Sequence, residues 1–168
     1  EKYCRKQALS DAEKHRLIFR KNTKRSCSKN MIIADTGFWL ALANRKDKYH
    51  FQANNVLITL DEPLITTCAV MTETVYLLLN RLGIKAQMNF IESYEKGAFK
   101  IFQLTEDHAT RIRELMQKYA NLPMDLADAS LVILAEFLGH GNILSTDIRD
   151  FNTYRWKQNK PFSNLLIS

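Results

Sequence analysis

The 168-residue chain is poor in glycine, proline and cysteine, and these shortages exclude several classes of protein. Its five glycines form neither a GxGxxG nor a GxxxxGK[ST] pattern, so the usual loops that bind dinucleotides or nucleoside triphosphates are absent. Its three cysteines are an odd number without a CxxC pair, which argues against a disulfide framework or a zinc ribbon and favours a reducing, cytoplasmic location. No apolar run reaches the roughly 18 residues of a membrane span, so we expect no membrane-spanning helix.

The positive charge of the chain is concentrated at one end. Residues 1–30 hold ten lysines or arginines and three acidic residues, a net charge of +7, so the total of +6 leaves −1 for residues 31–168. Met31 begins a strongly patterned region and resembles a natural start. We therefore treat residues 1–30 as a basic N-terminal arm, which is either an addition to the natural protein or a basic helix for a partner or nucleic acid. Residues 31–168 are expected to form one domain, since their length suits a single core.

From Met31 onward, short apolar runs alternate with longer helical patterns. The apolar runs predict strands at residues 31–34, 64–67, 99–104, 142–145 and 163–167. Helical spacing predicts helices at residues 38–42, 47–60, 69–82, 86–96, 105–119 and 125–138. Parallel neighbours need crossover connections, so this alternation predicts an α/β fold with a mainly parallel sheet and helices on both faces. Ligands of such sheets bind beyond the carboxyl ends of the strands.

Acidic residues stand at those expected strand ends and early in two helices. Asp35 and Asp147 each end a predicted strand, and Glu73 lies early in the helix that follows the second strand. Asp125 and Asp128 lie at the start of the last long helix. In a parallel sheet all of them are expected at one edge, where each carboxylate raises the pKa of its neighbours unless a cation neutralises them. Mg²⁺ and Mn²⁺ prefer oxygen ligands and suit such a cluster.

Each acid taken alone also has a plain structural explanation. Asp125 follows Pro123 at a helix start, where it could serve as the N-cap, and Asp35 or Asp147 could form a turn. Asp128 is harder to explain in this way, because an unpaired charge in a nearly apolar helix costs several kcal/mol. The convergence of the acids favours a metal site.

The histidines and Cys68 are weaker candidates for a site. The histidines, at positions 15, 50, 108 and 140, are scattered without ligand spacing, so we expect them at the surface. Cys68 lies in an apolar stretch and is expected in the core rather than as a nucleophile.

Four segments carry the acids in a characteristic order. They are Ile33-Ala-Asp-Thr-Gly37, Thr72-Glu-Thr74, Leu126-Ala-Asp-Ala-Ser-Leu-Val132 with Ala135-Glu136, and Leu144-Ser-Thr-Asp147 with Arg149-Asp-Phe151. As a set they resemble the PIN domain, and within it the VapC-type toxin ribonucleases of type II toxin–antitoxin systems. The resemblance extends from Met31 to about Ile167, and nothing in residues 1–30 belongs to it.

The resemblance implies a three-layer α/β/α sandwich that binds Mg²⁺ or Mn²⁺ and cleaves RNA phosphodiester bonds. Matched position by position, the catalytic and metal-binding acids of the family fall on Asp35, Glu73, Asp128 and Asp147. Asp125 matches an extra acid of some members, and Thr146 matches the usual hydroxyl neighbour. For a toxin, the resemblance also implies an antitoxin partner and a homodimer.

RNA binding would require basic and stacking side chains close to the acids. The candidates that follow Asp147 are Arg149, Tyr154, Arg155, Trp156 and Lys157. The alternative for this segment is a solvated C-terminal turn with Trp156 packed on the core. The main rival function is a PIN-like module that binds RNA or a partner protein without cleaving, and an intact set of four acids argues against it.

Overall fold

The computed structural model describes residues 30–167 of the chain. The predicted basic arm over residues 1–30 therefore lies, except for Asn30, outside the described residues. Within the described part, no helix is long and apolar enough to cross a membrane.

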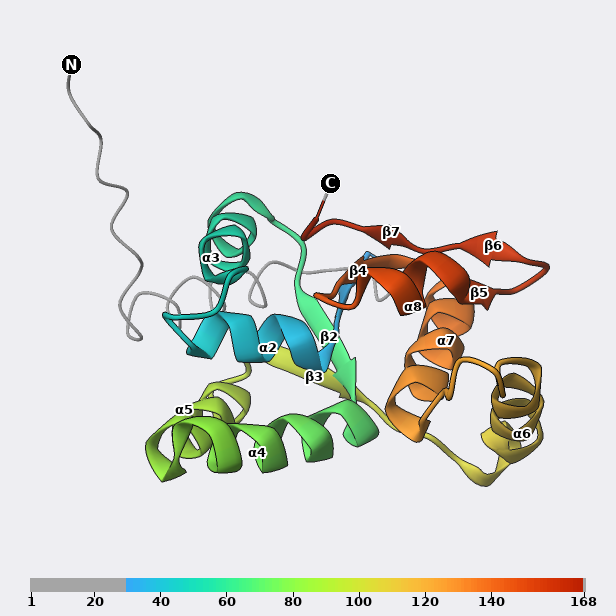
Figure 1. The fold of residues 1–168 in the computed structure, drawn as a ribbon, viewed down its shortest axis with the longest axis horizontal. Coiled ribbons are helices and arrows are strands. Elements are labelled where there is room, and N and C mark those ends of the chain that lie inside the picture. The colour runs from blue at the N-terminus through green and yellow to red at the C-terminus, as the bar shows by residue number, and fades with distance from the viewer. Residues whose placement is uncertain (1–29, 168) are drawn as a thin grey trace, which may run out of the picture.

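A five-stranded parallel sheet forms the centre of the fold (Figure 1). Its strands lie in the order β3-β2-β1-β4-β7, and every neighbouring pair is parallel. The strands are β1 (Ile32–Ala34), β2 (Leu64–Thr67), β3 (Phe99–Phe102), β4 (Asn142–Leu144) and β7 (Ser163–Asn164). Ile33 of the central strand β1 pairs with Ile65 on one side and Ile143 on the other. Strands β1 and β2 are buried along their whole length, which explains their unbroken apolar character.

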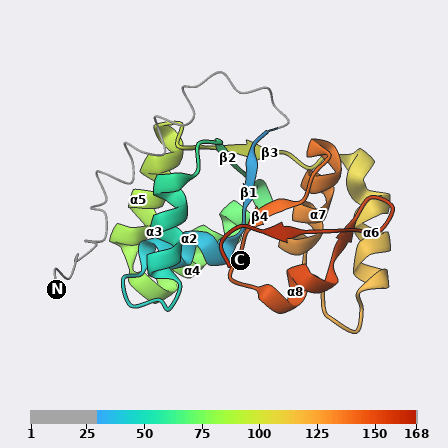
Figure 2. The same ribbon diagram turned by 90° about the horizontal axis from the view of Figure 1, so that it is seen from above.

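Helices cover both faces of this sheet and complete three layers (Figure 2). On one side lie α2 (Thr36–Ala43), α3 (His50–Thr59), α4 (Cys68–Leu82) and α5 (Ile84–Glu95). On the other side lie α6 (Ala109–Lys118), preceded by the 3-10 turn η1 (Glu106–His108), and α7 (Leu126–Leu138). The short helix α8 (Ile148–Thr153) follows β4. The predicted three-layer α/β/α architecture with a parallel sheet is confirmed.

The helix starts are fixed by polar side chains. The N-caps that accept a hydrogen bond from a backbone N–H of the following turn are Asp35 of α2, Thr67 of α4, Asp125 of α7 and Asp147 of α8. The single helix predicted over residues 105–119 is divided, because Thr105 and His108 form a capping box around a 3-10 turn before α6 begins. Gly83 separates α4 from α5 with a φ of 85°, a conformation that favours glycine.

Two sequence-based expectations about burial are wrong. His50, expected at the surface, is only 7% exposed, and its ring Nδ1 donates to the carbonyl oxygen of Ala41 at 2.7 Å. Cys68, expected in the core, is an exposed free cysteine at the first position of α4. Helix α7 is buried over most of its length, as its apolar sequence predicts.

A small hairpin near the C-terminus corrects one candidate for RNA binding. Strands β5 (Arg155–Trp156) and β6 (Lys160–Pro161) pair in antiparallel fashion. Trp156 is only 6% exposed, and its indole N–H donates to the carbonyl oxygen of Pro161 at 2.9 Å. A base cannot stack on a ring that the protein already covers, so the alternative of a core tryptophan is the correct one.

Candidate active site

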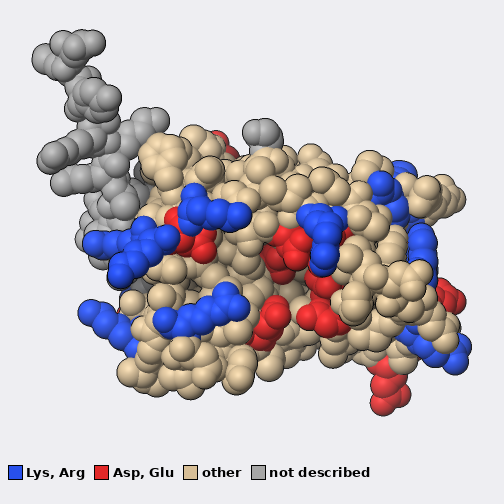
Figure 3. Space-filling view, in the orientation of Figure 1, with Lys and Arg blue, Asp and Glu red and all other residues tan. Residues whose placement is uncertain are grey.

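Acidic side chains gather in the hollowed middle of one face of the molecule, with lysine and arginine side chains on both sides (Figure 3). Asp35 directly follows β1 and Asp147 closely follows β4, and these two strands pair in parallel, so both acids reach the same edge. Glu73 comes from the second turn of α4 and Asp128 from the first turn of α7, and these two helices pack against each other. The structure therefore brings all four predicted acids to one region.

Asp35 is the most buried of these acids, at 8% exposed. Its Oδ1 accepts a hydrogen bond from the backbone N–H of Thr36 at 2.6 Å, and its Oδ2 accepts one from the hydroxyl of Ser145 at 2.7 Å. Burial raises the pKa of Asp35 to about 6, although these two hydrogen bonds act in the opposite direction. The charges of Glu73 and Asp147 raise this pKa further, which places both within electrostatic reach.

Thr36 connects Asp35 to Glu73. Its backbone N–H holds Asp35, while its hydroxyl donates to Oε2 of Glu73 on α4. Thr36 is itself buried, and the hydroxyl of Thr74 lies 3.5 Å from its Oγ1. One residue thus fixes the positions of two acids that are far apart in the sequence.

Asp128 is half-buried, and its Oδ2 accepts a hydrogen bond from the hydroxyl of Tyr154 at 2.9 Å. Burial is the main reason why the pKa of Asp128 rises to about 7. The nearby charges of Asp125, Asp35 and Asp150 raise this pKa as well, and the hydrogen bond from Tyr154 lowers it. The side chain that holds Asp128 is thus a neutral hydroxyl rather than a charged group.

Asp125 and Asp147 cap the two helices that border the cluster. Oδ1 of Asp125 accepts from the backbone N–H of Asp128 at 2.9 Å, and Oδ1 of Asp147 accepts from that of Asp150 at 3.1 Å. The N-cap considered for Asp125 is therefore present. A carboxylate has a second oxygen, so capping a helix is compatible with binding a cation.

The hydroxyl of Ser145, which no pattern in the sequence singled out, contacts two of the acids. Besides donating to Asp35, the buried Ser145 Oγ accepts from the backbone N–H of Asp147 at 3.0 Å. Thr146 packs against Gly37, where an added Cβ would lie 2.0 Å from the Thr146 hydroxyl oxygen. Gly37 is thus required for the close approach of α2 to the segment after β4.

Comparison with known proteins gives the family of this fold and acid cluster. The family described as PIN domain matches residues 32–157. The chain belongs to the PIN-domain family. Ribonuclease VapC26 of Mycobacterium tuberculosis (strain ATCC 25618 / H37Rv) is 24% identical over 124 residues, which cover 74% of this chain and 92% of the relative.

A solved structure has the same fold as this PIN domain. The crystal structure of Mycobacterium tuberculosis VapC20, described as a sarcin-ricin loop cleaving toxin, superposes with a TM-score of 0.64 at 24% sequence identity. The match covers 71% of this chain and 92% of that chain.

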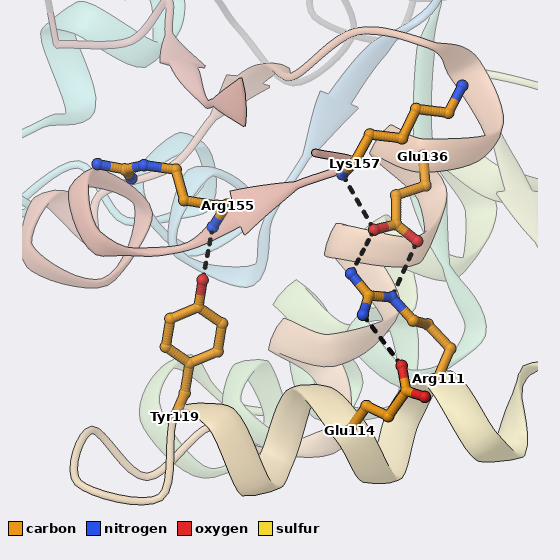
Figure 4. A network of polar contacts seen from close by, with 6 residues as sticks. All are labelled: Arg111, Glu114, Tyr119, Glu136, Arg155 and Lys157. Carbon is orange, nitrogen blue, oxygen red and sulfur yellow. Dashed lines mark hydrogen bonds and ion pairs between the residues drawn. The ribbon is translucent and has the colours of Figure 1, made fainter. Parts of the chain in front are cut away.

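The basic residues that follow Asp147 in the PIN domain differ in how accessible their charges are. Arg149 is exposed, and its Nε lies 2.9 Å from Oδ1 of Asp150. The guanidinium of Arg155 donates to the backbone carbonyls of Asn152 and Tyr154, at 2.7 and 2.8 Å. The ammonium of Lys157 points away from Glu136 (Figure 4). The Glu136 carboxylate instead accepts a hydrogen bond from the backbone N–H of Lys157. Arg149 and Lys157 therefore have the more accessible charges. Lys157 lies beside Glu136, which is roughly 12 Å along α7 from Asp128.

The donor chemistry of the acid cluster fits a hard divalent cation. All the candidate ligand atoms are carboxylate oxygens, and the pKa values of Asp35 and Asp128 are raised mainly by burial and further by neighbouring acids, an effect that a bound cation would counter. Among residues 30–167, no three acidic, histidine or cysteine side chains are grouped closely enough to hold a metal ion directly. A cation bound there would therefore have to keep some of its water ligands.

Proposed function

We propose that this PIN-domain protein is an endoribonuclease of the VapC toxin type that depends on Mg²⁺ or Mn²⁺. The observation that carries the proposal is the cluster of four carboxylates, two of which have pKa values raised to about 6 and about 7. Such a cluster destabilises the empty protein and is useful only where positive charge enters it. The similarity to Ribonuclease VapC26 supports RNA as the substrate.

A divalent cation, when bound, supplies positive charge against the phosphoryl oxygens and lowers the pKa of a water molecule. We assign Asp35 and Asp128 as the principal ligands, because they are the two acids whose pKa burial raises and a side-chain hydroxyl holds one oxygen of each in place. Glu73 and Asp147 complete the site, either as ligands directly or through water, or by orienting the attacking water and accepting its proton. Asp125 is proposed as an accessory acid at the edge of the site.

The RNA backbone is proposed to run from the acids along the basic residues that follow Asp147 in the sequence. Arg149 and Lys157 would contact phosphates, and Arg155 would contribute charge from a more fixed position. As a toxin of this type, the protein would act in the cytoplasm, form a homodimer and be held inactive by a cognate antitoxin.

The test is cleavage of an RNA pool by the purified, partner-free protein. The pool should contain total RNA, transfer RNA and ribosomal RNA, because the relative VapC20 is described as cleaving the sarcin-ricin loop. Reactions with Mg²⁺ or Mn²⁺ are compared with reactions in chelator, for wild type, Asp128→Asn and Glu95→Gln. Glu95 is a matched control, since it is an exposed acid on α5.

We expect discrete products that disappear in chelator and in Asp128→Asn but persist in Glu95→Gln. Wild type and Asp128→Asn that are both folded and equally inert would contradict the proposal. Retained RNA binding by such inert proteins would support the rival function, a PIN-like module that binds without cleaving.

A further inference from the structure

Tyr154, a candidate for RNA binding in the sequence, is instead a buried side chain that no base can stack on, and the proposed function has so far given it no role. It is 0% exposed, and its hydroxyl donates to Oδ2 of Asp128 at 2.9 Å. Asp128 belongs to α7, whereas Tyr154 follows α8, so the bond joins two elements across the acid cluster. A buried tyrosine needs a partner for its hydroxyl, and here that partner is a proposed metal ligand.

Neighbouring rings hold Tyr154 in one position. Tyr119 packs edge-on against it with ring centroids 5.0 Å apart, and Phe151 does so at 5.6 Å. The backbone N–H of Tyr154 donates to the carbonyl oxygen of Asp150 at 2.8 Å. Tyr119 is fixed in turn, because its hydroxyl oxygen accepts a hydrogen bond from the backbone N–H of Arg155 at 2.9 Å (Figure 4). The hydroxyl of Tyr154 is therefore a donor with a defined location.

Helix α8 connects this donor to a second acid. Asp147 is the N-cap of α8 and Tyr154 is its C-cap, so both ends of the same six-residue helix reach the cluster. A helix of that length is about 9 Å long, which sets the separation of the two ends. The same element thus places Asp147 directly and Asp128 through Tyr154.

We propose that Tyr154 is a positioning residue, which fixes the rotation of the Asp128 carboxylate relative to Asp147 for binding of a divalent cation. The proposal rests on the metal site of the proposed function. Hydrogen-bond partners that orient metal ligands typically contribute about 10- to 100-fold to metal affinity. A tyrosine that only packed in the core would affect folding but would not affect metal affinity selectively.

The test compares Tyr154→Phe with Tyr119→Phe. Each variant keeps its ring in the same aromatic cluster and loses one hydrogen bond of its hydroxyl. Tyr154→Phe loses the bond that it donates to the Asp128 carboxylate, and Tyr119→Phe loses the bond that it accepts from the backbone N–H of Arg155. Mn²⁺ affinity of the metal-free proteins is measured by calorimetry, urea unfolding is measured in parallel, and kcat and KM are measured on any RNA that wild type cleaves.

We expect Tyr154→Phe to weaken Mn²⁺ binding by about 10-fold and to lower kcat with little change in KM, while Tyr119→Phe keeps wild-type Mn²⁺ affinity. In the Asp128→Asn background, the effect of Tyr154→Phe on Mn²⁺ affinity should disappear. Unchanged Mn²⁺ affinity in Tyr154→Phe, or an equal loss in both tyrosine variants, would overturn the proposal.

A second measurement does not depend on the folding of a variant. In wild type with ¹³C-labelled tyrosine, Mg²⁺ should shift the Cζ resonance of Tyr154 and leave that of Tyr119 in place, and the reverse pattern would overturn the proposal. Wild type that binds Mn²⁺ without cleaving RNA would contradict only the proposed function. Wild type that binds no Mn²⁺ would contradict both.

Discussion

Replacing Asp128 by asparagine should stabilise the metal-free protein at about pH 8. In the folded state the pKa of Asp128 is raised to about 7, mainly by burial, whereas an unfolded aspartate has a pKa of about 3.9. Between these values the folded protein keeps a proton that the unfolded chain has lost. The contribution of Asp128 to stability is therefore most favourable below about pH 4 and becomes unfavourable as the pH rises from about 4 to about 7.

The magnitude follows from the size of this shift. About three pKa units at roughly 1.4 kcal/mol each give an upper bound of about 4 kcal/mol lost above neutral pH. Because the charge of Asp128 interacts with those of Asp35 and Asp125, only part of this energy belongs to Asp128 alone. We therefore expect Asp128→Asn to raise the free energy of unfolding by about 2 kcal/mol at about pH 8, which raises Tm by roughly 4–8 °C. Asparagine keeps an oxygen that can accept from Tyr154, so that hydrogen bond is not lost.

The assay is urea and thermal unfolding in chelator, followed by circular dichroism from about pH 4 to about pH 8, with Glu95→Gln as control. The gain of Asp128→Asn should be largest at the alkaline end and should vanish near pH 4. A variant that is no more stable than wild type at about pH 8, or a gain that does not change with pH, would refute the raised pKa.

Three further predictions concern the same fold. Saturating Mg²⁺ should stabilise wild type, by about 2.7 kcal/mol at a concentration 100 times the Kd, and should have little effect on the Tm of Asp128→Asn. Gly37→Ala should lower the free energy of unfolding in urea by about 1–3 kcal/mol, because the new Cβ would meet the Thr146 hydroxyl. Adding Thr146→Ala should recover part of this loss, and additive losses would contradict the steric explanation. Glu136→Gln weakens the ion pair with Arg111, whose N–O distance is 2.7 Å, and should lower the free energy of unfolding by about 1 kcal/mol. RNA cleavage should not change, and a loss of cleavage would show that this ion pair supports the site.

Much of the fold and the gathering of the acids at one edge could be predicted from the sequence, because both depend on local patterns. Buried parallel strands are continuous apolar runs. Asp35 directly follows β1, and Asp147 lies shortly after the end of β4. Topology then brings these ends to one edge. The partners of the acids could not be predicted, since the Tyr154 hydroxyl meets Asp128 across 26 residues and Ser145 meets Asp35 across 110.

The first residues of helices and short irregular segments are the places where the sequence was least informative. His50 and Cys68 each begin a helix, where the helical pattern does not yet indicate which side faces the core. The segment after β4 has no repeating pattern, so nothing in the sequence indicates that Ser145 contacts Asp35. The strands around Trp156 have only two residues each, too few for a period, and their turn uses positive φ angles at Lys157 and Asn159 where no glycine marks them.

Three acids of the cluster are also helix caps, and this affects how substitutions at the proposed site should be interpreted. Asp35, Asp125 and Asp147 are the N-caps of α2, α7 and α8, so the N-termini of three helices meet at the cluster. The partial positive charge of these helix ends offsets part of the repulsion among the carboxylates. An alanine at such a position removes both the cap and the charge, whereas an asparagine keeps the cap. Cleavage lost in the asparagine variants therefore reports the need for charge, while cleavage lost only in the alanine variants reports the placement of the helix.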